Sequence, residues 1–187
     1  MKKLVFALSL VPALAFAEMK IATVNMLVLA RNHPRYEEDE KFLKNKSADL
    51  KKLTDDIKAE GETLQSEGKK LMEQFNNPML NDKAKADLSK QLQDIQKKLI
   101  EIEQRYRTEA MRGNDDIQAD QNRFMKATAE DIRARIKAYV AKHGINLVLD
   151  TAVTAYADES LDITDAILTE MGVDPRKAKG KEKHEGK

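Results

Sequence analysis

Apolar residues recur at intervals of seven through a stretch of the chain that is otherwise charged. They are Leu43, Leu50, Ile57, Leu64 and Leu71. A second series with spacings of three and four follows, comprising Leu88, Leu92, Ile95, Leu99, Ile102 and Tyr106. Such spacings place apolar side chains along one stripe of a helix. The pattern predicts two helical limbs whose stripes pack together as the seam of an antiparallel hairpin.

Residues 76–81 separate the two series and read Asn-Asn-Pro-Met-Leu-Asn, which interrupts helix propagation and predicts the tip of the hairpin. The first limb is expected from Arg35 to Phe75, because Pro34 suits the start of a helix and the acidic run 37–40 favours its positive end. At about 1.5 Å per residue this limb extends roughly 60 Å, beyond the diameter of a compact domain. We therefore expect an arm over residues 35–113 that projects from a separate body.

The pairing of the limbs follows if Pro78 marks the midpoint of the hairpin, because residues whose numbers sum to 156 then face each other. This rule places Gly61 opposite Ile95 and Gly68 opposite Leu88. The two glycines then either admit the facing side chains or simply loosen the arm, and the sequence leaves both interpretations open.

The body is expected to combine residues 18–34 with residues 114–174, because Gly113 interrupts the second apolar series and predicts a bend where arm and body meet. Within these ranges we predict three strands and a terminal helix. The strands are Lys20–Asn25, Ile145–Asp150 and Thr151–Tyr156, and the helix is Asp165–Met171, capped by Asp162 or Thr164 and ended by Gly172. Three short strands bury little surface, so we expect an oligomer whose chains share one core.

Residues 1–17 have the features of a secretory signal peptide: Lys2 and Lys3, an apolar run interrupted by Pro12, and a final Ala-Phe-Ala. The alternative, an N-terminal membrane helix, needs a longer apolar run. The sequence thus predicts export to the periplasm. There is no cysteine, which excludes disulfides, thiolate metal sites and cysteine nucleophiles.

Charge is distributed unevenly along the chain. Without Lys2 and Lys3 the chain carries 31 basic and 32 acidic residues, but six basic and two acidic residues fall after Pro175. The remainder is mildly acidic, which argues against nucleic acid as a partner. Residues 175–187 are expected to be a disordered basic tail, which either solubilises the chain end or touches anionic lipid.

Motifs for catalysis or cofactor binding are missing from the sequence. It contains no Gly-rich phosphate loop, nucleophile elbow or His-Glu-x-x-His, and its histidines, His33, His143 and His184, are widely spaced. We therefore predict a non-enzymatic protein without a cofactor or a bound metal.

The chain resembles the Skp/OmpH family of periplasmic chaperones for outer-membrane proteins. The resemblance rests on three short segments that flank the predicted hairpin. They are Ile-Ala-Thr-Val-Asn-Met at 21–26, Ile-Asn-Leu-Val-Leu-Asp at 145–150 with Ala-Tyr at 155–156, and Asp-Ile-Thr at 162–164. The resemblance covers almost the whole mature chain, because the order of these segments, the signal peptide and the lack of cysteine also agree with the family.

This resemblance implies a mainly α protein with a small β-rich body, assembled as a homotrimer whose three arms surround a cavity. It implies that unfolded outer-membrane β-barrel proteins are held there without ATP. Residues expected in the core of the body and trimer are Ile21, Val24, Ile145, Leu147, Leu149 and Tyr156. A structural coiled-coil tether of the cell envelope is the alternative function.

A holding chaperone needs dispersed, individually weak apolar contacts, and the predicted tip offers Met72, Phe75, Met79 and Leu80 as candidates. Phe75 and Leu80 have a second interpretation, in which they only close the hairpin.

Overall fold

The computed structural model describes residues 19–182, so the predicted signal peptide lies outside the described part. The chain forms two compact units, one made of residues 1–32 with 132–187 and the other of residues 33–131. We call them the body unit and the hairpin unit. Most of the described chain is helical, as predicted.

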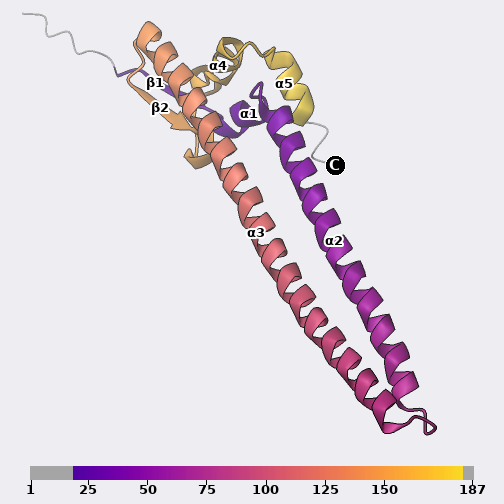
Figure 1. The fold of residues 1–187 in the computed structure, drawn as a ribbon. Coiled ribbons are helices and arrows are strands. Elements are labelled where there is room, and N and C mark those ends of the chain that lie inside the picture. Colours follow the sequence, from indigo (N-terminus) through magenta and orange to yellow (C-terminus); the bar gives the residue numbers. More distant parts are fainter. Residues whose placement is uncertain (1–18, 183–187) are drawn as a thin grey trace, which may run out of the picture. The chain divides into compact units, whose positions relative to one another are not determined.

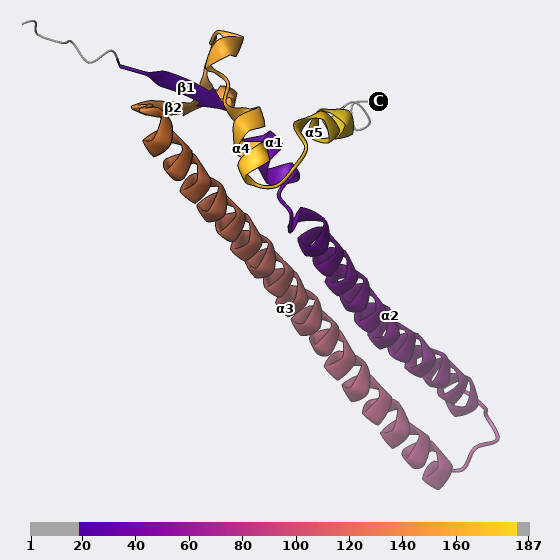
Figure 2. The same ribbon diagram turned by 90° about the horizontal axis from the view of Figure 1, so that it is seen from above.

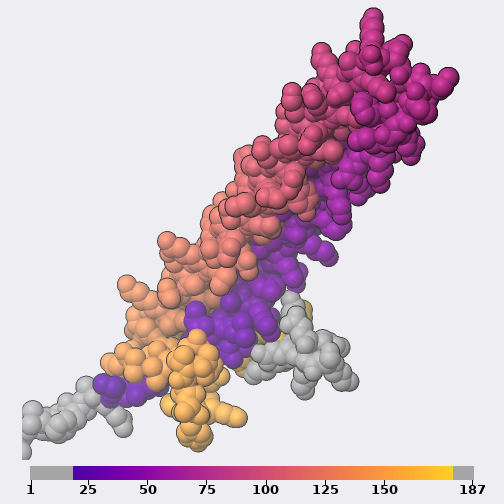
Figure 3. All heavy atoms as spheres, turned by 90° about the horizontal axis from the view of Figure 1, so that it is seen from below, coloured from indigo at the N-terminus to yellow at the C-terminus, as the bar shows by residue number. Residues whose placement is uncertain are grey.

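The hairpin unit consists of α2 (Tyr36–Phe75) and α3 (Asp82–His143), which run side by side and antiparallel in Figures 1 and 2. Residues 76–81 connect them at the predicted tip. The first limb starts one residue later than predicted and ends at the predicted residue. In Figure 3 the side chains of the two limbs pack against each other along the hairpin.

The sequence predicted a bend at Gly113, but the return limb α3 continues through Gly113 as one uninterrupted helix. A Cβ atom on Gly113 would overlap the side chain of Leu50. The glycine therefore serves the contact between the limbs and not a hinge. The division between the units falls after Asp131, so residues 114–131, expected in the body, belong to the hairpin unit.

The body unit contains a two-stranded parallel sheet of β1 (Ile21–Val24) and β2 (Leu147–Asp150), in which Ile21 pairs with Leu147. Both strands were predicted. The third predicted strand, Thr151–Tyr156, is wrong, because Thr151–Val153 form a short 3-10 helix. The Asp150 carboxylate accepts a hydrogen bond from the Ala152 N–H at 3.0 Å and so stabilises a turn in place of a strand.

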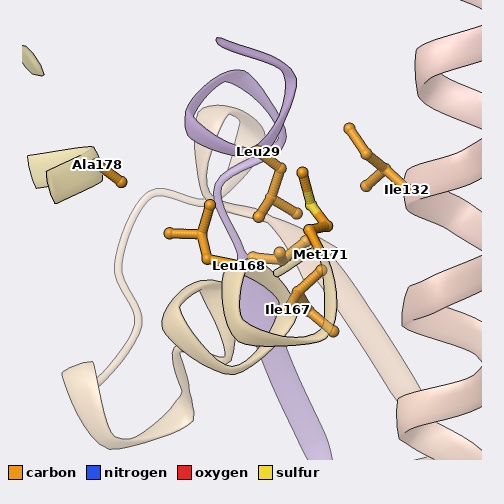
Figure 4. Close-up of a cluster of buried hydrophobic side chains, with 7 residues drawn as sticks. Leu29, Ile132, Ile167, Leu168, Met171 and Ala178 are labelled. Atoms are coloured by element: carbon orange, nitrogen blue, oxygen red, sulfur yellow. The ribbon is translucent and has the colours of Figure 1, made fainter. Parts of the chain in front are cut away.

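The sheet is accompanied by α1 (Met26–Arg31), a 3-10 turn at Glu159–Leu161, α4 (Thr164–Glu170) and α5 (Pro175–Glu182). Buried apolar side chains from these elements and from α3 form one cluster. It contains Val24, Leu29, Ile132, Ile167, Leu168, Met171 and Ala178, six of which are labelled in Figure 4. The N-terminal strand and the C-terminal helices thus share a core in which few residues are fully buried.

The ends of the helices follow local chemistry. Gly144 has a φ of +65° and ends α3 in the left-handed region, as predicted. The N-cap position of α4 is Ile163, and the carboxylate of the preceding Asp162 accepts a hydrogen bond from the Thr164 N–H at 2.8 Å. Gly172, after α4, has a φ of +78°.

The predicted disorder of residues 175–187 is wrong for the first eight of them, which form α5. The Asp174 carboxylate accepts from the Arg176 N–H at 2.9 Å and caps this helix, and Ala178 is buried. A charged composition therefore did not prevent helix formation, because a cap and one buried small residue anchor the segment. Residues 183–187 lie outside the described part.

Candidate functional site

The seam of the hairpin is organised by three glycines that each meet a large side chain of the other limb. A Cβ added to Gly61 would lie 3.4 Å from Ile102, and one added to Gly68 would lie 3.4 Å from Ile95. These are ordinary contact distances, so an alanine would fit at Gly61 and at Gly68, whereas at Gly113 it would overlap Leu50.

The register of the seam differs from the predicted one. Gly61 with Ile102, and Gly68 with Ile95, give number sums of 163 in place of 156. The difference is one heptad, and an apolar pattern that repeats every seven residues cannot distinguish two such registers. The sum of 163 also places Phe75 level with Leu88, so the first turns of α3 extend past the end of α2.

Burial along the seam is incomplete. Ile57 is buried, while the other seam residues of α2 and most of those of α3 are half-buried, and Tyr106 is exposed. Two helices alone have no third layer to cover the outer edges of their stripes. The arm therefore retains apolar surface along its length.

A cross-limb ion pair lies toward the base of the hairpin. Lys46 Nζ donates to Asp120 Oδ2 at 2.5 Å, and Arg123 Nη2 lies 2.8 Å from Asp120 Oδ1. The hydrogen bond from Lys46 holds the pKa of the Asp120 carboxyl below its usual value, against a smaller opposing effect of burial, and the charges of Lys46 and Arg123 lower it further.

Two further contacts reinforce this end of the seam. Phe42 and Phe124 meet edge to face with ring centroids 5.6 Å apart. The buried His33 places Nε2 3.1 Å from Asp131 Oδ2, while its Nδ1 accepts from the Arg35 N–H. Phe124 belongs to the apolar series that continues after Gly113, whereas periodicity did not identify Phe42, His33 or Asp131 as contact residues.

Two grooves run along the hairpin, one on each side of the seam. The groove that we call the open groove is lined by Lys58, Gly61, Glu62, Gln65, Gly68, Lys69, Met72, Ser89, Leu92, Gln93, Ile95, Gln96, Leu99, Ile100, Ile102, Glu103 and Tyr106. The opposite groove, the bridged groove, is lined by Glu60, Thr63, Leu64, Lys98, Glu101, Ile102 and Arg105. It takes its name from the ion pair between Arg105 and Glu60, which connects the two limbs.

The tip candidates differ in exposure. Met79 is 90% exposed and Met72 is exposed as well, whereas Phe75 and Leu80 are half-buried. Ile100, Met111 and Met125 are further exposed apolar residues on α3 that the sequence analysis did not single out. Ile100 directly follows a seam residue, and the two methionines lie beyond the regular apolar series.

The candidate core residues of the body occupy two different environments. Val24 is buried, and Ile145 is half-buried. Ile21, Leu147 and Leu149 are exposed on one face of the sheet, and Tyr156 is exposed beyond it. A single chain therefore leaves these three apolar side chains partly exposed, although Thr23 on the same face is buried.

Comparison with known families places these features in context. The family model described as Outer membrane protein (OmpH-like) matches residues 20–171, which include both strands and the entire hairpin. The chain belongs to the OmpH-like family. The search of curated proteins found no match. OmpH-like proteins are periplasmic chaperones that in general bind unfolded outer-membrane proteins.

Two properties of this OmpH-like chain bear on its interactions. Between residues 19 and 182, no helix has the length and apolar character needed to cross a membrane. Within the same range, no three His, Asp or Glu side chains are grouped closely enough to hold a metal ion. The family match stops at residue 171, so α5 is an addition beyond the matched region.

Proposed function

We propose that the protein is an ATP-independent periplasmic holdase that keeps unfolded outer-membrane proteins from aggregating. The observation that carries this proposal is the dispersion of exposed apolar side chains along a long hairpin. They are Phe42, Leu53, Met72, Met79, Ile100, Tyr106, Met111 and Met125. Each single contact of this kind is weak, whereas many such contacts made together hold a client firmly and still release it stepwise.

Methionine contributes four of these eight residues. Its flexible, polarizable side chain adapts to varied apolar partners, which suits a protein that must accept many client sequences. The seam itself is only partly buried, so limited bending of the limbs costs little packing energy. Both properties favour the function of a holding chaperone over that of a rigid structural spacer.

We propose that three copies of the chain assemble through the body unit. The exposed sheet face formed by Ile21, Leu147 and Leu149 supports this assembly, because a two-stranded sheet with a partly uncovered apolar face is marginal on its own. Three arms would then enclose a client between them. The exposed Tyr156 lies close in sequence to β2 and is proposed to join the same interface.

The test is the aggregation of an outer-membrane β-barrel protein diluted from urea, followed by light scattering without added nucleotide. A holdase suppresses scattering at about one trimer per client. A structural tether of the envelope leaves scattering unchanged, and that outcome would reject the proposed function. A variant without the tip residues 76–81, replaced by a short glycine-serine turn, serves to separate the tip from the rest of the arm.

A further inference from the structure

The two grooves beside the seam each carry two basic and two acidic residues, but charged residues make up a larger share of the lining in the bridged groove. Four of the seven residues lining the bridged groove are charged, and the Arg105–Glu60 ion pair links its two walls. The open groove carries two lysines and two glutamates over a longer stretch, and these charges cancel. Between them its walls are formed by glutamines. The open groove is thus the less charged flank of the hairpin.

Exposed apolar side chains concentrate along the open groove as well. Met72, Ile100 and Tyr106 line it and are all exposed, and none of them lines the bridged groove. The lining of the open groove also includes Gly61 and Gly68, which lie against Ile102 and Ile95 of the other limb, and the half-buried Leu92, Ile95 and Leu99. Both grooves have depth, but only the open groove adds these exposed apolar side chains to its lining.

The length of the open groove sets the size of its ligand. The α3 residues that line it run from Ser89 to Tyr106, which corresponds to about 25 Å along the helix. An extended chain advances about 3.3 Å per residue, so roughly eight residues span this distance. A membrane-spanning β-strand has about 9–11 residues, with apolar and polar side chains in alternation.

We propose that the open groove binds one extended, uncharged, amphipathic segment of an unfolded client. This inference rests on the proposed function and assigns a binding site to it. The apolar side chains of the segment lie against Met72, Leu99 and Ile100, and its polar side chains point outward. The amides of Gln65, Gln93 and Gln96 both donate and accept hydrogen bonds, so they serve the unpaired backbone groups of the segment whatever its sequence. The balanced charge of the groove favours a neutral segment over an acidic or a basic one.

The first test places charges in the groove. Met72 and Ile100, 48% and 51% exposed, are both changed to Asp. The control carries Thr63→Asp and Thr108→Asp, which add the same charge at exposed hairpin residues outside the open groove and apart from the proposed client contacts. The groove variant is expected to lose about tenfold in client affinity, and the control less than about twofold. Equal losses in the two variants would overturn the groove proposal.

Failure of the groove proposal is distinct from failure of the proposed function, which would appear as wild-type protein that does not suppress aggregation. Circular dichroism of both variants verifies that the hairpin remains helical. Because all four substituted side chains are exposed, we expect both variants to fold.

The second test observes occupancy directly and does not depend on charged variants. The chain has no cysteine, so Gln65→Cys can be labelled with a polarity-sensitive dye, with Thr108→Cys, at an exposed residue outside the open groove, as the control label. The probe is a synthetic nine-residue peptide in which Val and Leu alternate with Ser and Gln. Saturable blue-shifted emission is expected from the dye at residue 65 only.

No response at residue 65, or an equal response at both labels, would overturn the proposal. A response of the residue 65 dye to added unlabelled protein without peptide would overturn it too, because the groove would then be covered by a second copy of the chain. A peptide of the same composition with all apolar residues in one block should bind at least several-fold more weakly.

Discussion

Lys46 and Asp120 are 74 residues apart in the sequence, yet Lys46 Nζ lies 2.5 Å from Asp120 Oδ2. This ion pair joins α2 to α3 at a level where the apolar series of the return limb has already ended. It supplements a seam that few fully buried residues stabilise. We therefore expect it to matter more here than an isolated pair on the surface of a globular domain.

Replacement of Asp120 by Asn should lower the melting temperature of the hairpin, because Lys46 then loses its charged partner. The charge swap Lys46→Asp with Asp120→Lys restores an opposite-charge pair and should recover part of the loss, although the lysine introduced at position 120 then faces Arg123. Thermal unfolding followed by circular dichroism measures both variants. If the charge-swapped variant and Asp120→Asn have the same melting temperature, the pair does not stabilise the hairpin through its charges.

The same pair gives the hairpin a defined pH dependence. The pKa of Asp120 is lowered from its usual value of 3.8, because Lys46 stabilises the carboxylate. Its contribution to stability is therefore complete above the unfolded-state pKa and is lost as the pH falls through the lower pKa of the folded state. Stability profiles between pH 2 and 6 should show a smaller acid loss for Asp120→Asn than for the wild type.

Two glycine substitutions should have opposite effects. Gly61→Ala adds a methyl group at an ordinary contact distance of 3.4 Å from Ile102 and removes a helix-interior glycine, which should stabilise the hairpin by up to about 1 kcal/mol. Gly113→Ala overlaps Leu50 and should destabilise it by about 1–3 kcal/mol. Urea unfolding gives both values, and a stabilising Gly113→Ala would mean that Gly113 is not required by packing.

The segment beyond the family match should contribute to the stability of the body unit. Ala178→Asp places a charge at a buried position of α5 and should cost about 1–3 kcal/mol, whereas Lys177→Asp at the neighbouring exposed position should cost much less. The difference in urea midpoint between these variants measures the docking of α5. Equal midpoints would show that α5 does not pack in solution.

The exposed sheet face provides a test of the proposed trimer. Leu149→Asp places a charge on that face and should dissociate the assembly, whereas Leu27→Asp on α1, at another exposed leucine, should leave it intact. Sedimentation velocity at micromolar concentration distinguishes the two results. A trimer that tolerates Leu149→Asp would place the interface elsewhere.

Heptad spacing in the sequence was sufficient to predict the limbs, because Leu43 to Leu71 and Leu88 to Tyr106 leave few alternatives to a hairpin. The register was not predictable, since a shift of seven residues still places an isoleucine or a leucine opposite Gly61 and Gly68. Contacts beside the stripe, such as Lys46 with Asp120, distinguish the registers only when the structure is known.

Competing local interactions explain the remaining differences between the predicted and the observed structure. The residues after Asp150 are rich in β-branched and aromatic side chains, which predicts a strand, but the Asp150 side chain caps a turn instead. At Gly113 the helix-breaking tendency of glycine is outweighed by close packing with Leu50. The open groove was not predictable because it arises from side chains of both limbs, brought together only in the observed register.

The mass of the protein in solution, with and without a urea-diluted outer-membrane protein, tests most directly whether a trimer holds an unfolded client. We expect a trimer alone and a complex of one trimer with one unfolded client, formed without nucleotide. A monomer at micromolar concentration that forms no complex with the client would contradict this expectation.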